Sequence, residues 1–224
     1  MIWDTLKNTL LGDLRERIDT RAEAADRESL HNLCASFYGR FPAEDMRERS
    51  VENLYGCLYG LLRFIGNWPD TAPKVRIFNP EIQNHGWESK YTVVAVLCRG
   101  IPFCTASVRG ELNRRNLTIH TIASCNLPVQ RDAAGGLLAV LPDEQAAQRA
   151  EAEEAVLYFE IGRHSNPAEL EELRLTLVEI LQEVALVVDD FPAVCGRLED
   201  VEQAILGSDC VEQALRSEAA AFIN

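Results

Sequence analysis

Apolar residues recur at helical spacing through the first seventy residues of the chain. One apolar stripe runs through residues 26–38, and a wider one runs from Val51 to Ile65. Residues three or four positions apart share one face of a helix, so these stripes predict two amphipathic helices that must pack on another apolar surface. Gly39 ends the first helix, and the segment Gly66–Pro69 ends the second.

The middle of the chain changes to extended patterns. The segment 91–98 is almost continuously apolar and rich in β-branched residues, which predicts a buried central strand. Gly135 and Gly136, followed by the apolar segment 137–141, predict a hairpin. Further extended segments are expected at Val75–Phe78, Leu117–Val129 and Ala155–Ile161.

Proline and asparagine mark the ends of two further helices. Pro102 fits the first position of a helix, which needs no backbone N–H donor, and Asn116 suits the left-handed conformation that often ends one. A longer helix is expected to begin at Asn166 and Pro167, and the segment Asp189–Pro192 is expected to end it. The inward stripe of the first helix is predicted to be Phe103, Ser107, Val108 and Leu112.

This order of elements predicts a fold class. Strand–helix–strand–strand–helix is typical of an α+β fold with a ferredoxin-like antiparallel sheet and helices on one face. The closing strand of that arrangement is not found after the second helix, and Val75–Phe78 is expected to fill its place. The polar stretch Asp143–Glu154 is expected as a helical or mobile insertion. With flanking helices at both ends, three regions are predicted: residues 1–72, 73–190 and 191–224.

The composition excludes several classes of function. The chain of 224 residues has a formal net charge of -13, whereas a nucleic-acid surface needs a basic stripe. Its seven cysteines are scattered without a Cys-x-x-Cys pair, which indicates free thiols in a reducing compartment. The N-terminus has no signal-peptide core and no segment has the length of a membrane span. We therefore expect a cytoplasmic protein with no membrane partner.

The sequence motifs of catalysis and cofactor binding are missing. No Gly-x-Gly and no Gly-Lys-Ser or Gly-Lys-Thr occurs, so neither a dinucleotide fingerprint nor a P-loop is predicted. The four histidines lie far apart, and none is paired at metal-ligand spacing. We therefore predict no catalytic residue, no cofactor site and no metal site in this chain.

The first candidate binding site is the turn between the central strand and the helix that follows it. It consists of Arg99, Gly100, Ile101 and Pro102. The free N–H groups at the start of a helix can bind the carboxylate of a small effector. The alternative is a plain strand–helix turn, which every α/β fold contains.

The second candidate is the loop Asn84–Trp87, in which His85 and Trp87 are the candidate interface residues. An exposed tryptophan in a loop often lies at an interface with another subunit or domain. The alternative is that Trp87 covers the end of the sheet.

Several segments resemble, in this order, the N-terminal region of the large NAD-specific glutamate dehydrogenases. The most specific segments are Val75–Pro80, His85–Trp87, Pro102–Phe103 and Glu111–Arg115. The resemblance covers most of the chain, from the region of Asn53–Gly56 to residues 218–222. In that family this part is an ACT-like regulatory segment ahead of the catalytic core.

The resemblance implies that residues 73–190 are an ACT-type domain in the regulatory or assembly part of a longer enzyme. That enzyme would oxidise L-glutamate to 2-oxoglutarate and ammonia with NAD, and its catalytic lysine and NAD-binding domain would lie downstream. The expected partners are an amino-acid effector and other subunits or domains of the same enzyme. The uncapped helical pattern of Ser217–Asn224 fits a truncated chain.

The sequence departs from the family at two places around Pro102. The family usually has acidic residues there, where this chain has Gly100 and Ala106. If those acids bind an effector amine or an adjacent subunit, that function is weakened or altered in this protein. Two alternatives also stay open: a free-standing amino-acid sensor of ACT type, and a ligand-free module that holds subunits together.

Overall fold

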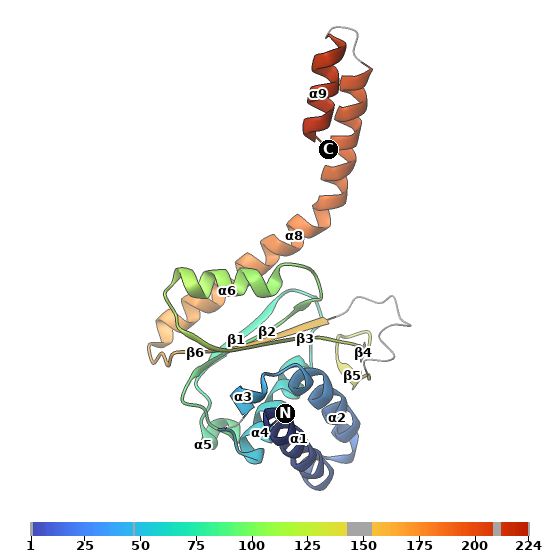
Figure 1. Ribbon diagram of the computed structural model, residues 1–224. Helices are drawn as coiled ribbons and strands as arrows, with labels where there is room; N and C mark the ends of the chain where they lie inside the picture. Colours follow the sequence, from blue (N-terminus) through green and yellow to red (C-terminus); the bar gives the residue numbers. More distant parts are fainter. Residues whose placement is uncertain (1, 47, 143–153, 208–211, 224) are drawn as a thin grey trace. The chain divides into compact units, whose positions relative to one another are not determined.

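The computed structural model describes residues 2–46, 48–142, 154–207 and 212–223. Its centre is a four-stranded antiparallel sheet in the order β1–β2–β6–β3 (Figure 1). The strands are β1 Lys74–Phe78, β2 Thr92–Arg99, β3 Ile119–Leu127 and β6 Glu154–Ile161. The predicted hairpin is confirmed as β4 (Val129–Arg131) paired with β5 (Leu137–Val140). The expected insertion falls on residues 143–153, outside the described residues.

Strand β1 occupies the place of the closing strand in a ferredoxin-like sheet. It pairs with β2 at the edge of the sheet, with Lys74 opposite Leu97 and Phe78 opposite Val93. Strand β6 lies on the other side of β2 and joins it to β3. The predicted α+β fold, with its antiparallel sheet and with Val75–Phe78 as the missing strand, is therefore confirmed.

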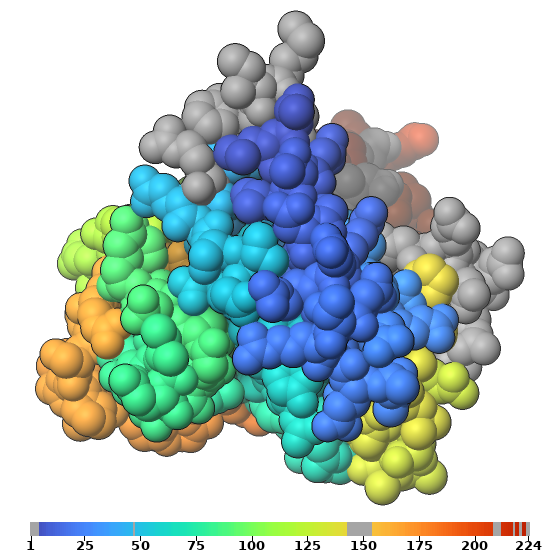
Figure 2. All heavy atoms as spheres, turned by 90° about the horizontal axis from the view of Figure 1, so that it is seen from below, coloured from blue at the N-terminus to red at the C-terminus, as the bar shows by residue number. Residues whose placement is uncertain are grey.

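Helices cover both faces of the sheet. Helix α6 and the first turns of α8 lie on one face, and helices α1 to α4 cover the other (Figure 1). Figure 2 views the molecule from the second face, where the N-terminal helices, in blue and cyan, overlie the sheet. The helices are α1 Ile2–Arg21, α2 Ala24–Gly39, α3 Ala43–Met46, α4 Val51–Ile65, α5 Ile82–His85, α6 Cys104–Arg114, α8 Pro167–Leu206 and α9 Gln213–Ile223.

The N-terminal helices and the sheet share one hydrophobic core. The ring of Phe37 on α2 packs edge to face on Tyr158 of β6, with centroids 5.5 Å apart. The hydroxyl group of Tyr38 donates to the carbonyl of Leu54 at 2.9 Å, which joins α2 to α4. Residues 1–182 accordingly form one compact unit, and residues 183–224 form another. This division differs from the expected boundaries at residues 72 and 190.

Two predicted helix boundaries are wrong, whereas the one at Asn116 is confirmed. Helix α6 starts at Cys104, and Phe103 precedes it with φ +71° and a side chain 69% exposed, outside the inward stripe. Helix α8 continues through Pro192. A proline removes one backbone N–H donor, but a helix can continue past it. Asn116, with φ +57°, follows α6 in the predicted left-handed conformation.

Candidate functional site

The predicted effector turn Arg99–Pro102 lies where the chain leaves β2. The N–H of Ile101 donates to the carbonyl of Arg99 at 2.8 Å, and Gly100 is exposed. Buried Cys104 places its Sγ 4.0 Å from the same carbonyl. The side chain of Cys98 is hydrogen-bonded to Cys104 and thereby lowers the pKa of the Cys104 thiol. Binding of an effector at this turn stays a prediction.

The second predicted segment contains a short helix, α5, followed by a buried tryptophan. Gly86 ends α5 in the left-handed conformation, with φ +75°, and donates its N–H to Ile82 at 2.9 Å. Trp87 is only 4% exposed and packs edge to face on Phe78. The expectation of an exposed loop tryptophan is therefore wrong. The structure agrees with the alternative, in which Trp87 covers the sheet, and a wider interface at this segment stays a prediction.

A glycine on α4 makes the burial of Trp87 possible. A Cβ atom on Gly56 would lie 2.6 Å from the Cβ of Trp87, closer than two non-bonded carbon atoms can approach. A Cβ atom on Gly60, one turn further along α4, would lie 3.6 Å from the indole nitrogen, at ordinary contact distance. Gly56 therefore lets the tryptophan approach the helix backbone, and Gly60 leaves space beside the ring.

Beside Trp87 lies a cavity of about 220 Å³, which we call the Trp87 cavity. It is lined by residues of two helices, α4 and α5, and of three strands, β1, β2 and β6. Its apolar wall includes Cys57, Leu61, Phe64, Phe78, Val93 and Ala95, and its polar groups include Arg63, Arg76, Asn84 and His85. Sequence reasoning singled out only His85 and Trp87 of this set. The two arginines were missed, because nothing in their spacing shows that separate elements bring them together.

Trp87 also lines a larger polar cleft of about 810 Å³. At it, the guanidinium group of Arg49 donates two hydrogen bonds to the carboxylate of Glu160, at 2.9 and 2.7 Å. The hydroxyl group of Tyr158 donates a third to that carboxylate at 2.8 Å. Burial alone would lower the pKa of Arg49, but the hydrogen bonds and charge of Glu160 raise it above its usual value.

Other charged groups at this cleft also pair with one another. Lys90 lies 3.4 Å from Glu48, and Arg163 lies 3.9 Å from Glu81. These ion pairs join the loop between α3 and α4 and the residue before α5 to β6 and to the residues beside β2 and β6. We assign this cleft no ligand.

Comparison with known proteins identifies the family of this chain. The sequence profile of the glutamate dehydrogenase ACT1 domain matches residues 33–177. This chain belongs to that family. A NAD-specific glutamate dehydrogenase from Halomonas elongata is 41% identical over 182 residues, and one from Pseudomonas aeruginosa is 36% identical over 165 residues. No solved structure matches the chain.

The ACT1-domain chain spans only a small part of these relatives. The matched regions are 81% and 74% of this chain, but 11% of the Halomonas protein and 10% of the Pseudomonas protein. Within the described residues, no group of three or more histidine, cysteine or acidic side chains is placed to hold a metal ion. None of the helices in the described part of the chain is long and apolar enough to cross a membrane.

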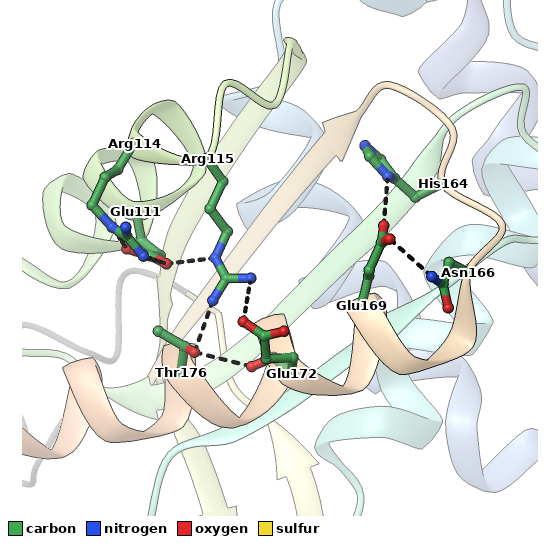
Figure 3. A network of polar contacts seen from close by, with 8 residues as sticks. All are labelled: Glu111, Arg114, Arg115, His164, Asn166, Glu169, Glu172 and Thr176. Atoms are coloured by element: carbon green, nitrogen blue, oxygen red, sulfur yellow. Dashed lines mark hydrogen bonds and ion pairs between the residues drawn. The ribbon is translucent and has the colours of Figure 1, made fainter.

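Within the ACT1 domain, the segment Glu111–Arg115 joins two helices. The buried carboxylate of Glu111 accepts hydrogen bonds from Arg114 at 2.7 and 2.8 Å and from Arg115 at 2.6 Å (Figure 3). Arg115 also donates to the hydroxyl group of Thr176 on α8 at 3.0 Å and lies 3.2 Å from Glu172. This segment, one of the four most specific in the family resemblance, thus forms a structural link between α6 and α8.

The start of α8 belongs to the same surface. The side chain of Asn166 accepts a hydrogen bond from the N–H of Ala168 at 3.1 Å and donates one to Glu169 at 2.8 Å (Figure 3). This confirms Asn166 as the predicted cap of α8. The cap and the link through Arg115 together fix the position of the first turns of α8 against the sheet domain.

The stability of the domain should depend on the ionisation of Glu111. Hydrogen bonds from Arg114, followed by those from Arg115, lower the pKa of this carboxyl from 4.5 to about 2 against the opposing effect of burial. A lowered folded-state pKa stabilises the fold above the unfolded pKa, and that contribution is lost as the pH falls from about 4.5 to about 2. Glu111→Gln should therefore lower the free energy of unfolding by about 2 kcal/mol at pH 7, and the difference should shrink toward pH 3.

Urea denaturation of the unchanged chain and of Glu111→Gln between pH 7 and pH 3, followed by circular dichroism, measures this difference. Glu171→Gln is the matched control, because Arg174 donates the same two hydrogen bonds to Glu171 at 2.8 and 2.6 Å on an exposed surface. Exposed ion pairs contribute little. Equal effects of the two substitutions would contradict the role given to Glu111.

Proposed function

We propose that this chain is the N-terminal regulatory and assembly portion of an NAD-dependent glutamate dehydrogenase. The match of residues 33–177 to the ACT1 domain of glutamate dehydrogenase carries the proposal. The two NAD-specific relatives support it, since each matches most of this chain at 36–41% identity. In a protein of their length, catalysis and NAD binding would lie outside the matched region.

The complete enzyme would oxidise L-glutamate to 2-oxoglutarate and ammonia in the cytoplasm, with the ACT1 domain controlling its rate or its assembly. Other subunits or domains of the same enzyme are the proposed protein partners. An amino-acid effector is the proposed small-molecule partner, with the turn Arg99–Pro102 as its site. The six described free cysteines are compatible with the reducing compartment of that proposal.

The test begins with the product of the complete reading frame that encodes this chain. We expect it to reduce NAD in the presence of L-glutamate, and we expect an amino acid to change that rate. Arg99→Gln should shift the effector concentration for half-maximal response without changing the rate measured without effector. Arg109→Gln serves as the control, because Arg109 is an exposed arginine on α6 outside the turn.

Two results would overturn the proposal. The first is a folded full-length product that shows no glutamate-dependent reduction of NAD under conditions in which the Pseudomonas relative is active. The second is a reading frame that ends at this chain, with amino-acid binding by the chain alone, which would favour a free-standing sensor. Ligand binding to the native state raises its melting temperature, so a thermal-shift panel of amino acids reports the second result.

A further inference from the structure

The charged groups of the Trp87 cavity are all of one sign. Arg63 at the end of α4 and Arg76 on β1 both line the cavity, and no described carboxylate lines it with them. Neither arginine forms an ion pair with any carboxylate of the described chain. Both residues are exposed, so their guanidinium groups are free to bind a ligand at the mouth of the cavity. They leave this cavity suited to an anion.

A third cation, Lys74, adds to the positive potential at this side of the sheet. The ammonium group of Lys74 donates to the carbonyls of Phe64 and Asn67 at 2.6 and 3.0 Å. Burial lowers its pKa, and the charges of Arg131 and Arg76 lower it further. An anion near Arg76 would relieve this mutual repulsion of cations.

The neutral polar groups of the cavity also include hydrogen-bond donors. The Nδ1 atom of His85 accepts the N–H of Glu81 at 3.1 Å, so in the neutral ring the proton lies on Nε2, which is then a donor. The indole Nε1–H of Trp87 forms no hydrogen bond with any described residue, and Trp87 lines the cavity, so this group can donate to a ligand. It lies beside Gly60, which also lines the cavity.

The rest of the wall is apolar and the space is small. Phe64, Phe78 and Val93 are among the side chains that enclose it. Since water occupies about 30 Å³ per molecule in the liquid, a cavity of about 220 Å³ holds roughly seven non-hydrogen atoms. That is the size of a carboxylate on a branched chain of about four further carbon atoms.

We propose that the Trp87 cavity binds a short branched aliphatic monocarboxylate, with its hydrocarbon part inside and its carboxylate at Arg63 and Arg76. An amino acid fits less well, because no described carboxylate in the lining would balance its ammonium group. The cavity lies on the α4 side of the sheet, apart from the turn Arg99–Pro102. The proposal therefore goes beyond the proposed function and does not depend on it.

Isothermal titration of the chain with 3-methylbutanoate tests the proposal, with the neutral amide of the same acid, leucine and succinate as comparisons. We expect binding of the monocarboxylate and at least about tenfold weaker binding of the other three, because the amide lacks the negative charge and leucine and succinate bring a second charge into an apolar space. Equal binding of acid and amide, or no binding of the acid at millimolar concentration, would overturn the proposal.

Three variants assign the binding to this cavity. Arg63→Gln and Arg76→Gln should each weaken binding of 3-methylbutanoate at least about tenfold, whereas Arg109→Gln should leave it unchanged. Gly60→Leu should abolish binding by filling the cavity, since its Cβ atom has room but the rest of the side chain enters the ligand space. Circular dichroism and melting temperature confirm that each variant is folded. Equal weakening by Arg109→Gln, or full binding by Gly60→Leu, would place the ligand elsewhere.

Discussion

Glu160→Gln should lower the free energy of unfolding by about 3–5 kcal/mol, because it leaves the charge of Arg49 buried without its anionic partner. The side chains are 18% exposed for Arg49 and 1% exposed for Glu160, so water replaces little of the lost interaction. The substitution also leaves Tyr158 with a weaker acceptor for its buried hydroxyl group. Urea denaturation at pH 7, followed by circular dichroism, measures the change.

The control is Glu52→Gln on the exposed side of α4. Glu52 pairs with Arg17 at 2.6 Å and with Arg21 at 2.9 Å, but its side chain is 49% exposed. Because exposed pairs contribute little, this substitution should change the free energy of unfolding far less than Glu160→Gln. A comparable loss of unfolding free energy in Glu52→Gln and Glu160→Gln would show that burial does not determine the contribution of the Arg49–Glu160 pair. A double variant, Arg49→Met with Glu160→Leu, should recover part of the loss, since it removes both charges.

Gly56→Ala should destabilise the domain by about 2–3 kcal/mol, although alanine favours a helix more than glycine does. The new methyl group would meet the Cβ of Trp87 at 2.6 Å, and that atom is fixed to the backbone and cannot rotate away. Trp87 must therefore leave its position against Phe78. Thermal unfolding measures the loss, and the near-ultraviolet circular dichroism of the tryptophan should weaken with it.

Gly60→Ala is the matched control on the same helix. Its methyl group has ordinary contact distance to the indole nitrogen, so the helical preference of alanine should dominate and raise the free energy of unfolding by up to about 1 kcal/mol. If both glycines responded alike, the close contact at Gly56 would not be the cause of the destabilisation.

The sequence predicted most of the sheet because its strands carry strong local patterns. The apolar run 91–98 became β2, whose residues Thr92 to Cys98 are all buried. Such a run is typical of a strand covered on both faces, and the N-terminal helices provide the second cover. Asn116 was also predictable, since few residues other than glycine adopt its left-handed conformation easily.

The candidate site was less predictable because its residues meet only in the folded chain. The burial of Trp87 depends on Gly56, which lies on another element, so the local loop pattern around His85 gave no sign of it. Arg63 belongs to an amphipathic helix and Arg76 to a short strand, and each looks like an ordinary surface arginine in the sequence. Only the pairing of β1 with β2, beside α4, brings the two to one cavity.

The place of β1 in the sheet has a consequence for the order of folding events. In the usual ferredoxin-like order, the edge strand beside the first strand comes last, and their pairing must close a long loop. Here β1 directly precedes β2, and Phe78 pairs with Val93 across a short connection. Loop closure costs less entropy over a short separation, and local contacts form faster. The pairing of β1 with β2 should therefore form early. Insertion of β6 between β2 and β3 should then complete the sheet in the slow step.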